Sequence, residues 1–277
     1  MGHATKIEWC DATFNPWRGC AKTSPGCKHC YAERQATRNP GLLGTWGPAG
    51  TRPLANETYW RQAKQWQGKA ERTGRRLRVF CGSMMDVFED RPDLEEPRRR
   101  LFNTIYETPA LDWLILTKRP RVMFDWLGGL SGMGWGAFAE HFPNAWLGTS
   151  IENQATADER LPILAECRAR FLFVSAEPLL EPIKIRPWLD QAIAWCIIGG
   201  ESGPQARPCD ILWIDALRND CLATDTACFI KQLGSNAMAN GKPLRLHHPK
   251  GADPAAWPNQ LRCREFPADQ TMEQRHP

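Results

Sequence analysis

The chain has 277 residues, of which 42% are hydrophobic and 24% charged, and its net charge of +4 permits an acidic partner without requiring one. This length fits one large α/β domain or two small ones, since single barrels reach ~250 residues. The apolar content excludes a disordered chain. The longest apolar runs, such as residues 192–198, are far shorter than the ~20 residues that span a bilayer. Met1 to Glu8 lack the apolar stretch of a secretory signal, so we expect a cytoplasmic protein with no membrane partner.

The first predicted elements are short. A strand-like start at residues 12–14 leads into a loop broken by glycine and proline, and this loop leads into a helix-like run at 31–37. Residues 39–60 are rich in glycine, proline and threonine and predict a long loop. We take this loop as the beginning of an insertion at about 39–77.

Beyond residue 77, short apolar runs alternate with segments of helical pattern. The apolar runs are 78–81, 113–116, 145–148, 171–174, 193–198 and 228–230. The helical segments between them are 94–106, 121–127, 156–167 and 211–222. Runs this short and this uniformly apolar are typical of strands buried on both faces of a parallel sheet. The alternation predicts an α/β fold with a parallel sheet.

The last part of the chain, residues 244–277, has a different composition. It contains several prolines and no regular apolar period. We predict an irregular extension that packs on the main domain, 1–243, and ends in disordered residues.

Each predicted strand is followed by small or polar residues. They are Gly82-Ser83, Thr117-Lys118, Thr149-Ser150, Ser175 to Glu177, Gly199 to Ser202 and Lys231-Gln232. In parallel sheets, ligands bind beyond the carboxyl ends of the strands. For any one of these residues, capping of the next helix is the alternative role. The same arrangement after six strands predicts one large site on one rim of the sheet.

Eleven cysteines are many for a cytosolic chain, and the number is odd. Disulfides are rare in a reducing compartment, so metal ligands or small buried side chains explain them better. Cys20, Cys27 and Cys30 form a C-x6-C-x2-C pattern on the loop after residues 12–14. Thiolates bind soft metals, and a C-x2-C pair brings two sulfurs to one centre from a tight turn. The seven cysteines from Cys81 onward lie in apolar runs or isolated positions, which predicts core residues.

Three cysteine ligands, in place of four, favour one kind of centre. A structural zinc site has four protein ligands and no open position. An iron–sulfur cluster held by three cysteines leaves one iron available to a substrate or cofactor. The pattern therefore favours a cluster. The alternatives are zinc, with His29 or Cys10 as the fourth ligand, and three incidental thiols.

Several motifs give the chain a wider resemblance. They are Asn15-Pro16-Trp17 with the cysteine loop, VFCGSMMDVF at 79–88, LTKRP at 116–120, LGTSIEN at 147–153, SAEPLL at 175–180, GGESG at 199–203 and FIKQLG at 229–234. Over roughly residues 5–267, the sequence resembles a family of phage and prophage proteins with a three-cysteine motif. The cysteine loop after a first strand also resembles the radical S-adenosylmethionine (SAM) superfamily, whose common spacing is C-x3-C-x2-C. This resemblance implies a partial (β/α) barrel of about six parallel strands, with a [4Fe-4S] cluster and SAM as cofactors.

The resemblance also implies an enzyme that generates a 5′-deoxyadenosyl radical and takes its electron from a donor such as flavodoxin or ferredoxin. The residues then expected to hold SAM are Ser83, Lys118, Ser150, Glu152, Ser175, Glu177, Gly199, Gly200 and Glu201. The residues expected to bind substrate are Asp86, Arg119, Lys231 and Gln232, because cations beyond two strands suit a phosphate or carboxylate. A salt bridge between rim residues, such as Asp86 with Lys118, is the alternative role.

A basic stretch precedes the second predicted strand. Between Arg61 and Arg78, seven basic residues stand against one acid, and Trp60 and Trp66 lie among them. Basic groups beside stacking aromatics suit single-stranded or flipped nucleotides; the alternative is a solvated amphipathic helix whose tryptophans pack on the barrel. We expect a nucleotide, a nucleic-acid base or another phosphorylated small molecule as substrate. The alternative functions are a zinc-bearing nucleic-acid-binding module without catalysis, and a structural protein.

Overall fold

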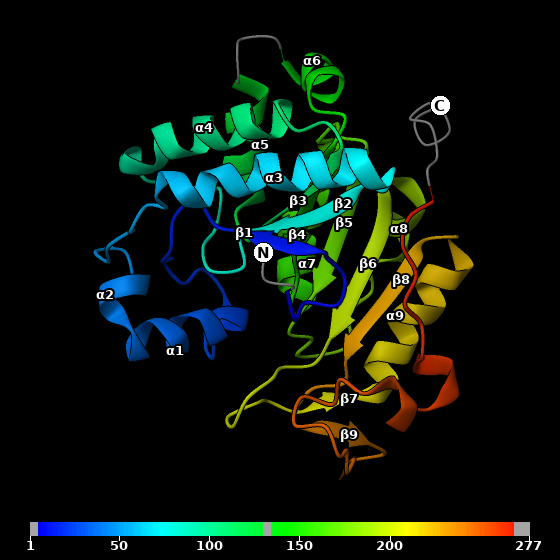
Figure 1. The fold of residues 1–277 in the computed structure, drawn as a ribbon. Coiled ribbons are helices and arrows are strands. Elements are labelled where there is room, and N and C mark those ends of the chain that lie inside the picture. Colours follow the sequence, from blue (N-terminus) through cyan, green and yellow to red (C-terminus); the bar gives the residue numbers. More distant parts are fainter. Residues whose placement is uncertain (1–4, 130–133, 269–277) are drawn as a thin grey trace. The chain divides into compact units, whose positions relative to one another are not determined.

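The computed structural model describes residues 5–129 and 134–268 (Figure 1). Within these residues, the main sheet has seven strands in the order β1-β2-β3-β4-β5-β6-β8. The strands are β1 (Ala12–Phe14), β2 (Leu77–Cys81), β3 (Leu111–Thr117), β4 (Ala145–Ser150), β5 (Phe171–Ala176), β6 (Ile193–Gly199) and β8 (Ala227–Gln232). The pairs β1–β2, β2–β3, β5–β6 and β6–β8 are parallel. The predicted α/β fold and partial barrel are confirmed, and each of the six predicted strands lies inside an observed one.

The chain divides into two compact units. The first comprises Met1–Thr23, Ala32–Gly148 and Cys167–Arg170, and the second comprises Ser24–Tyr31, Thr149–Glu166 and Phe171–Pro277. The helices assigned mainly to the first unit are α1 (Tyr31–Arg38), α2 (Pro40–Leu43), α3 (Glu57–Thr73), α4 (Glu95–Tyr106), α5 (Pro120–Gly129) and α6 (Gly134–His141). Those of the second are α7 (Gln154–Glu166), α8 (Arg186–Gln191) and α9 (Ile211–Ala223).

Helix α3 occupies much of the stretch predicted as insertion. It begins after Asn56, whose side chain accepts a hydrogen bond from the backbone N–H of Tyr59, and it ends at Gly74 in the left-handed region (φ 62°). The helix packs on β2 and β3 of the first unit (Figure 1). Its start at Glu57 lies inside the segment 39–60 that was predicted as loop, although the glycines and prolines of that segment all precede Leu54.

The two tryptophans of the basic stretch pack inward from α3. The ring centroids of Trp60 and Trp66 lie 5.3 and 6.2 Å from that of Phe14 in β1. The guanidinium of Arg100 lies 4.3 Å from the ring centroid of Trp60. Both tryptophans thus contribute to the packing of the first unit, as the amphipathic-helix alternative expects.

In the second unit, α9 packs beside β6 and β8 (Figure 1). A small sheet of β7 (Cys209–Asp210), β9 (Ala237–Ala239) and β10 (Lys242–Pro243) follows, in the order β10-β9-β7. The tail returns along β8, where the N–H of Ile230 donates to the carbonyl of Cys263 over 2.8 Å. The predicted disorder of the last residues concerns 269–277, which lie outside the described residues.

Burial follows the expectation for parallel strands. Every residue of β4, β5 and β6 is buried. Uniform burial is the reason why these strands are continuous apolar runs in the sequence. Among the described helices, none is both long and apolar enough to cross a membrane.

Candidate metal centre

The three cysteines of the C-x6-C-x2-C pattern lie in the loop between β1 and α1. All three are thiols of intermediate exposure, whereas Cys81 and Cys196 in the strands are buried. Among residues 5–129 and 134–268, no group of three or more His, Cys, Asp or Glu side chains is arranged to hold a metal ion. The chemistry of the donor set nonetheless fits a soft metal, since three thiols of intermediate exposure occur on one short loop.

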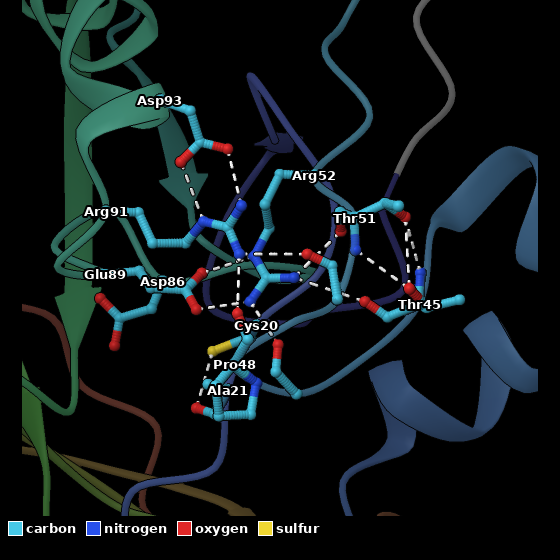
Figure 2. Close-up of polar contacts among 12 residues, drawn as sticks. Cys20, Ala21, Thr45, Pro48, Thr51, Arg52, Asp86, Glu89, Arg91 and Asp93 are labelled. Atoms are coloured by element: carbon cyan, nitrogen blue, oxygen red, sulfur yellow. Dashed lines mark hydrogen bonds and ion pairs between the residues drawn. The ribbon is translucent and has the colours of Figure 1, made fainter.

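On the first unit, Arg119 contacts the segment that carries Cys20. Its guanidinium donates one hydrogen bond to Sγ of Cys20 over 3.7 Å and another to the carbonyl oxygen of Ala21 over 2.8 Å. The same group forms an ion pair of 2.8 Å with Asp86. Figure 2 labels Cys20, Ala21 and Asp86, the three residues that Arg119 contacts. Arg119 therefore joins the cysteine loop to the loop that follows β2.

Asp86 is a buried acceptor, only 5% exposed. Besides Arg119, it accepts hydrogen bonds from the hydroxyl of Thr117 over 2.7 Å and from the backbone N–H groups of Phe88 and Lys118 over 2.9 and 3.1 Å. The ion pair of Asp86 is thus with Arg119, while the contact from Lys118 comes from its backbone. These donors fix the carboxylate and, through it, the guanidinium.

The electrostatics around Cys20 favour its neutral form. Burial and the Asp86 carboxylate raise the pKa of the Cys20 thiol to about 12, although Arg119 acts in the opposite direction. Burial also opposes the charge on Arg119, but Asp86 and Cys20 outweigh it and raise the pKa of the guanidinium. Metal binding at Cys20 must therefore release the thiol proton.

A second arginine lies beside Gly19, the residue before Cys20. Arg52 forms an ion pair with Glu89 over 2.5 Å, and both side chains are almost fully buried (Figure 2). It also donates to the carbonyl oxygen of Thr51 over 3.0 Å. A Cβ on Gly19 would lie 2.7 Å from that same oxygen, and the φ of Gly19 is +104°. The approach of the loop to Cys20 therefore requires glycine at position 19.

Ser83, which was predicted to hold SAM, forms a hydrogen bond with Asn15 of the cysteine-loop motif. Asn15 donates from its amide to the hydroxyl of Ser83 over 2.9 Å and accepts from the backbone N–H of Met84 over 2.8 Å. Asn15 is itself 5% exposed. It therefore holds the segment after β2 in place.

In the second unit, a buried carboxylate holds the turn that carries Cys27. Ser24 donates its hydroxyl to Glu152, which is fully buried and pairs with Arg160 over 3.1 Å. A Cβ on Gly26 would overlap the side chain of Glu152. The turn is thus packed directly on Glu152, and this close approach requires a glycine.

A second carboxylate holds the same turn closer to Cys30. Glu201 is 5% exposed and accepts from Arg207 over 2.6 Å, and Nδ1 of His29 lies 3.1 Å from its Oε2. Arg207 also donates to the carbonyl oxygen of Pro25 over 3.0 Å. Burial alone would raise the pKa of the Glu201 carboxyl, but the hydrogen bonds from Arg207 and His29 lower it to about 2. Glu201 is therefore ionised at neutral pH.

Four predicted rim residues of the second unit come together. Lys231 pairs with Glu177 over 2.9 Å, and the hydroxyl of Ser175 donates to Glu177 over 3.2 Å. A Cβ on Gly199 would lie 2.6 Å from the nearer carboxylate oxygen of Glu177. The side chains of Glu177 and Lys231 are 14% and 25% exposed, so both are partly available to a ligand.

The other predicted residues of this unit make backbone contacts. The amide of Gln232 donates to the carbonyl of Gly200 over 2.8 Å, and Gly200 packs against the backbone of Leu233 with no room for a side chain. The carbonyl of Ser150 accepts from Arg160 over 2.7 Å.

The family comparison covers nearly the whole sequence. A model of the family described as "Protein of unknown function (DUF5131)" matches residues 4–271. The chain belongs to the DUF5131 family. A comparison of this DUF5131 protein with curated proteins gives no match.

The comparison with solved structures concerns the fold. Two mutants of spore photoproduct lyase are similar to this DUF5131 protein, with TM-scores of 0.47 and 0.48 at 13% sequence identity. Each match covers 76% of this chain and 58% of the lyase chain. The DUF5131 chain thus spans less than two thirds of the length of these structures.

Several residues of the site were not predicted from sequence, among them Asn15, Arg160 and Arg207. Arg160 is 2% exposed within α7. The one sequence signal for Arg160 is its charge among the apolar positions of the predicted helix 156–167. For Arg207 no local signal exists, because its partners Glu201 and Pro25 are recognised only in the folded chain.

Proposed function

We propose that this DUF5131 protein is an iron–sulfur enzyme of the radical SAM type, with Cys20, Cys27 and Cys30 as the ligands of a [4Fe-4S] cluster. The observation that carries the proposal is the support of the cysteine loop. Buried acid–arginine pairs contact both the Cys20 segment and the Cys27–Cys30 turn. Metal sites depend on such surroundings to orient their ligands.

Three cysteines leave one iron of such a cluster open to a ligand from outside the chain. When bound, the cluster supplies the electron that cleaves SAM to methionine and a 5′-deoxyadenosyl radical. The residues of the chain have the tasks of binding SAM, orienting it and excluding water.

For SAM itself, the pair Glu177–Lys231 is the best-suited group. Its partly exposed carboxylate accepts hydrogen bonds from an amine or a ribose hydroxyl, while the ammonium attracts a carboxylate. Ser175 orients Glu177, and Gly199 leaves the space that its side chain needs. Lys118, Ser83, Ser150 and Gly200 keep their proposed contacts with SAM.

We assign Glu152 and Glu201 a different task within the same site. Their carboxylates accept hydrogen bonds from the cysteine turn and from arginines, the buried Arg160 and the partly buried Arg207. These contacts suit a role in holding Cys27 and Cys30 better than a direct contact with SAM.

The proposed substrate is a nucleotide, a nucleic-acid base or another phosphorylated small molecule, bound near Lys231 and Gln232. We further propose a cytoplasmic protein of phage or prophage type that receives its electron from a flavodoxin or ferredoxin.

The test is metal loading under anaerobic conditions. Wild-type protein should bind iron and sulfide and absorb broadly near 400 nm, a rough value for iron–sulfur centres. Cys27→Ala should lose iron. The matched control, Cys10→Ala, removes another thiol of intermediate exposure and should retain it. After reduction, the loaded wild type should release 5′-deoxyadenosine from SAM; a loaded protein that never does so contradicts the enzymatic proposal.

One observation favours the second candidate, a zinc-bearing nucleic-acid-binding module without catalysis. Histidine ligands of zinc commonly bond their other ring nitrogen to a carboxylate, and His29 contacts Glu201 in this way. His29→Ala separates the two proposals. A zinc protein would lose much of its metal in this variant, whereas the iron–sulfur protein should keep its iron.

A further inference from the structure

We propose that Arg119 is a positioning residue for Cys20. Through this contact, Arg119 governs metal loading at Cys20 and raises the reduction potential of the bound cluster. This inference rests on the proposed function, because it concerns a cluster held by Cys20. It gives Arg119 and Asp86 a role in the metal site in place of the substrate contact expected from their place on the rim.

The hydrogen bonds of Arg119 define this role. One terminal nitrogen contacts both Sγ of Cys20 and Oδ2 of Asp86, and the other donates to the carbonyl of Ala21. The planar guanidinium holds these three acceptors in one fixed arrangement, which an ammonium group cannot reproduce. The side chain of Arg119 thereby holds both the sulfur of Cys20 and the carbonyl group of Ala21.

The anchor beneath Arg119 is rigid. Asp86 is fixed by Thr117, Phe88 and Lys118, and two of these residues precede Arg119 directly in the chain. The side chains of Arg119 and Asp86 are only 13% and 7% exposed. A charged hydrogen bond shielded from water is stronger than one on the surface, so this anchor resists displacement.

Two consequences follow for the metal site. Loss of the guanidinium releases the Cys20 segment and weakens iron binding, as the loss of a partner of a metal ligand usually does. Reduction adds negative charge to a cluster, and a cationic donor at a ligand sulfur stabilises that charge. Without Arg119 the reduced form is less stable, and the reduction potential falls.

The experiment compares four full-length proteins: the wild type, Arg119→Gln, Arg119→Lys and Arg121→Gln. Arg121 is the matched control, since it is 58% exposed and forms only a long ion pair of 3.8 Å with Asp125, which is 65% exposed. After anaerobic reconstitution, we measure iron affinity by competition with a chelator and the midpoint potential by titration followed in the visible spectrum and by electron paramagnetic resonance. Circular dichroism reports the fold.

We expect Arg119→Gln to bind iron about tenfold more weakly, a typical loss for such a partner, and its remaining cluster to have a lower midpoint potential. Arg119→Lys should keep a potential closer to that of the wild type, because it retains the positive charge. It should share the weaker iron binding of Arg119→Gln, because lysine lacks the planar guanidinium with its two terminal donor nitrogens. Arg121→Gln should match the wild type. Wild-type iron affinity and potential in Arg119→Gln would overturn the inference.

Arg119→Gln leaves Asp86 buried without its cation, which threatens the fold. The double variant Asp86→Asn with Arg119→Gln removes both charges and keeps the test of iron affinity available, with the same roughly tenfold weaker iron binding expected. Its midpoint potential should lie above that of Arg119→Gln, because the carboxylate that opposes the guanidinium is removed as well. If the wild type itself binds no iron, the proposed function fails. If the wild type loads normally and the variants do as well, only the role of Arg119 fails.

Discussion

Ser24 donates its hydroxyl to the carboxylate of Glu152, which lies 128 positions further along the chain. Glu152 follows β4 and is fully buried, with Arg160 of α7 as its ionic partner. The turn before Cys27 is therefore held by a buried ion pair of the second unit. Its position therefore depends on residues distant in sequence as well as on the residues of the turn.

Gly26 tests this packing. In Gly26→Ala the new methyl group overlaps Glu152, which is too confined to move away. We expect a loss of about 1–3 kcal/mol in the free energy of unfolding, as for other overpacked sites, together with a lower iron content. Urea unfolding and iron analysis measure the two effects. Gly41→Ala, where nothing lies near the new Cβ, is the control and should lower neither.

Glu152→Gln tests the ion pair itself. Glutamine keeps the shape and still accepts from Ser24, but it leaves the charge of the buried Arg160 unpaired. Breaking one side of a buried pair costs about 3–5 kcal/mol. We expect a fall of that order in the free energy of unfolding, measured by urea denaturation. Glu159→Gln, an exposed position on α7 next to Arg160, should remain within about 0.5 kcal/mol of the wild type. An equally small effect in Glu152→Gln would contradict the anchoring role.

Glu201 predicts a dependence of stability on pH. Arg207 and His29 lower the pKa of its carboxyl from an ordinary 4.5 to about 2 in the folded chain. A lowered pKa stabilises the folded state above the ordinary pKa, and this contribution is lost as the pH falls toward the folded value. Glu201→Gln should therefore be less stable than the wild type at pH 7, and the difference should shrink between pH 4.5 and about 2. Urea unfolding at several pH values measures it, and a difference that does not vary with pH would count against this pairing.

Glu177 separates cofactor binding from metal binding. In Glu177→Gln the carboxylate that pairs with Lys231 is lost, while the cysteine loop keeps its own anchors. We expect full iron content and about tenfold weaker SAM binding, the equivalent of one charged hydrogen bond at ~1.4 kcal/mol or more. Calorimetric titration of the loaded protein with SAM gives the affinity. Unchanged affinity would remove Glu177 from the SAM site.

The strands were predictable from the sequence for a local reason. A strand buried on both faces is apolar at nearly every position. Runs such as 193–198 can therefore be recognised from the local sequence, without knowledge of the strands that flank them in the sheet. Helices α6 and α8 were missed: α6 contains two glycines, and α8 is six residues long. Short or glycine-containing helices have weak local signals and depend on tertiary packing.

The sequence by itself determined the strands of the main sheet and most of the helices between them, the three thiols on one short loop and the polar residues at the strand ends. These features can be recognised from the pattern of apolar residues and from the spacing of residues that are close in sequence. Only the tertiary structure decided which charges meet: Arg119 with Asp86 and Cys20, and Arg207 with Glu201 and the carbonyl of Pro25, 182 positions away. An ion pair needs two side chains within a few ångströms, and that separation depends on how the chain folds back on itself, which no local pattern records.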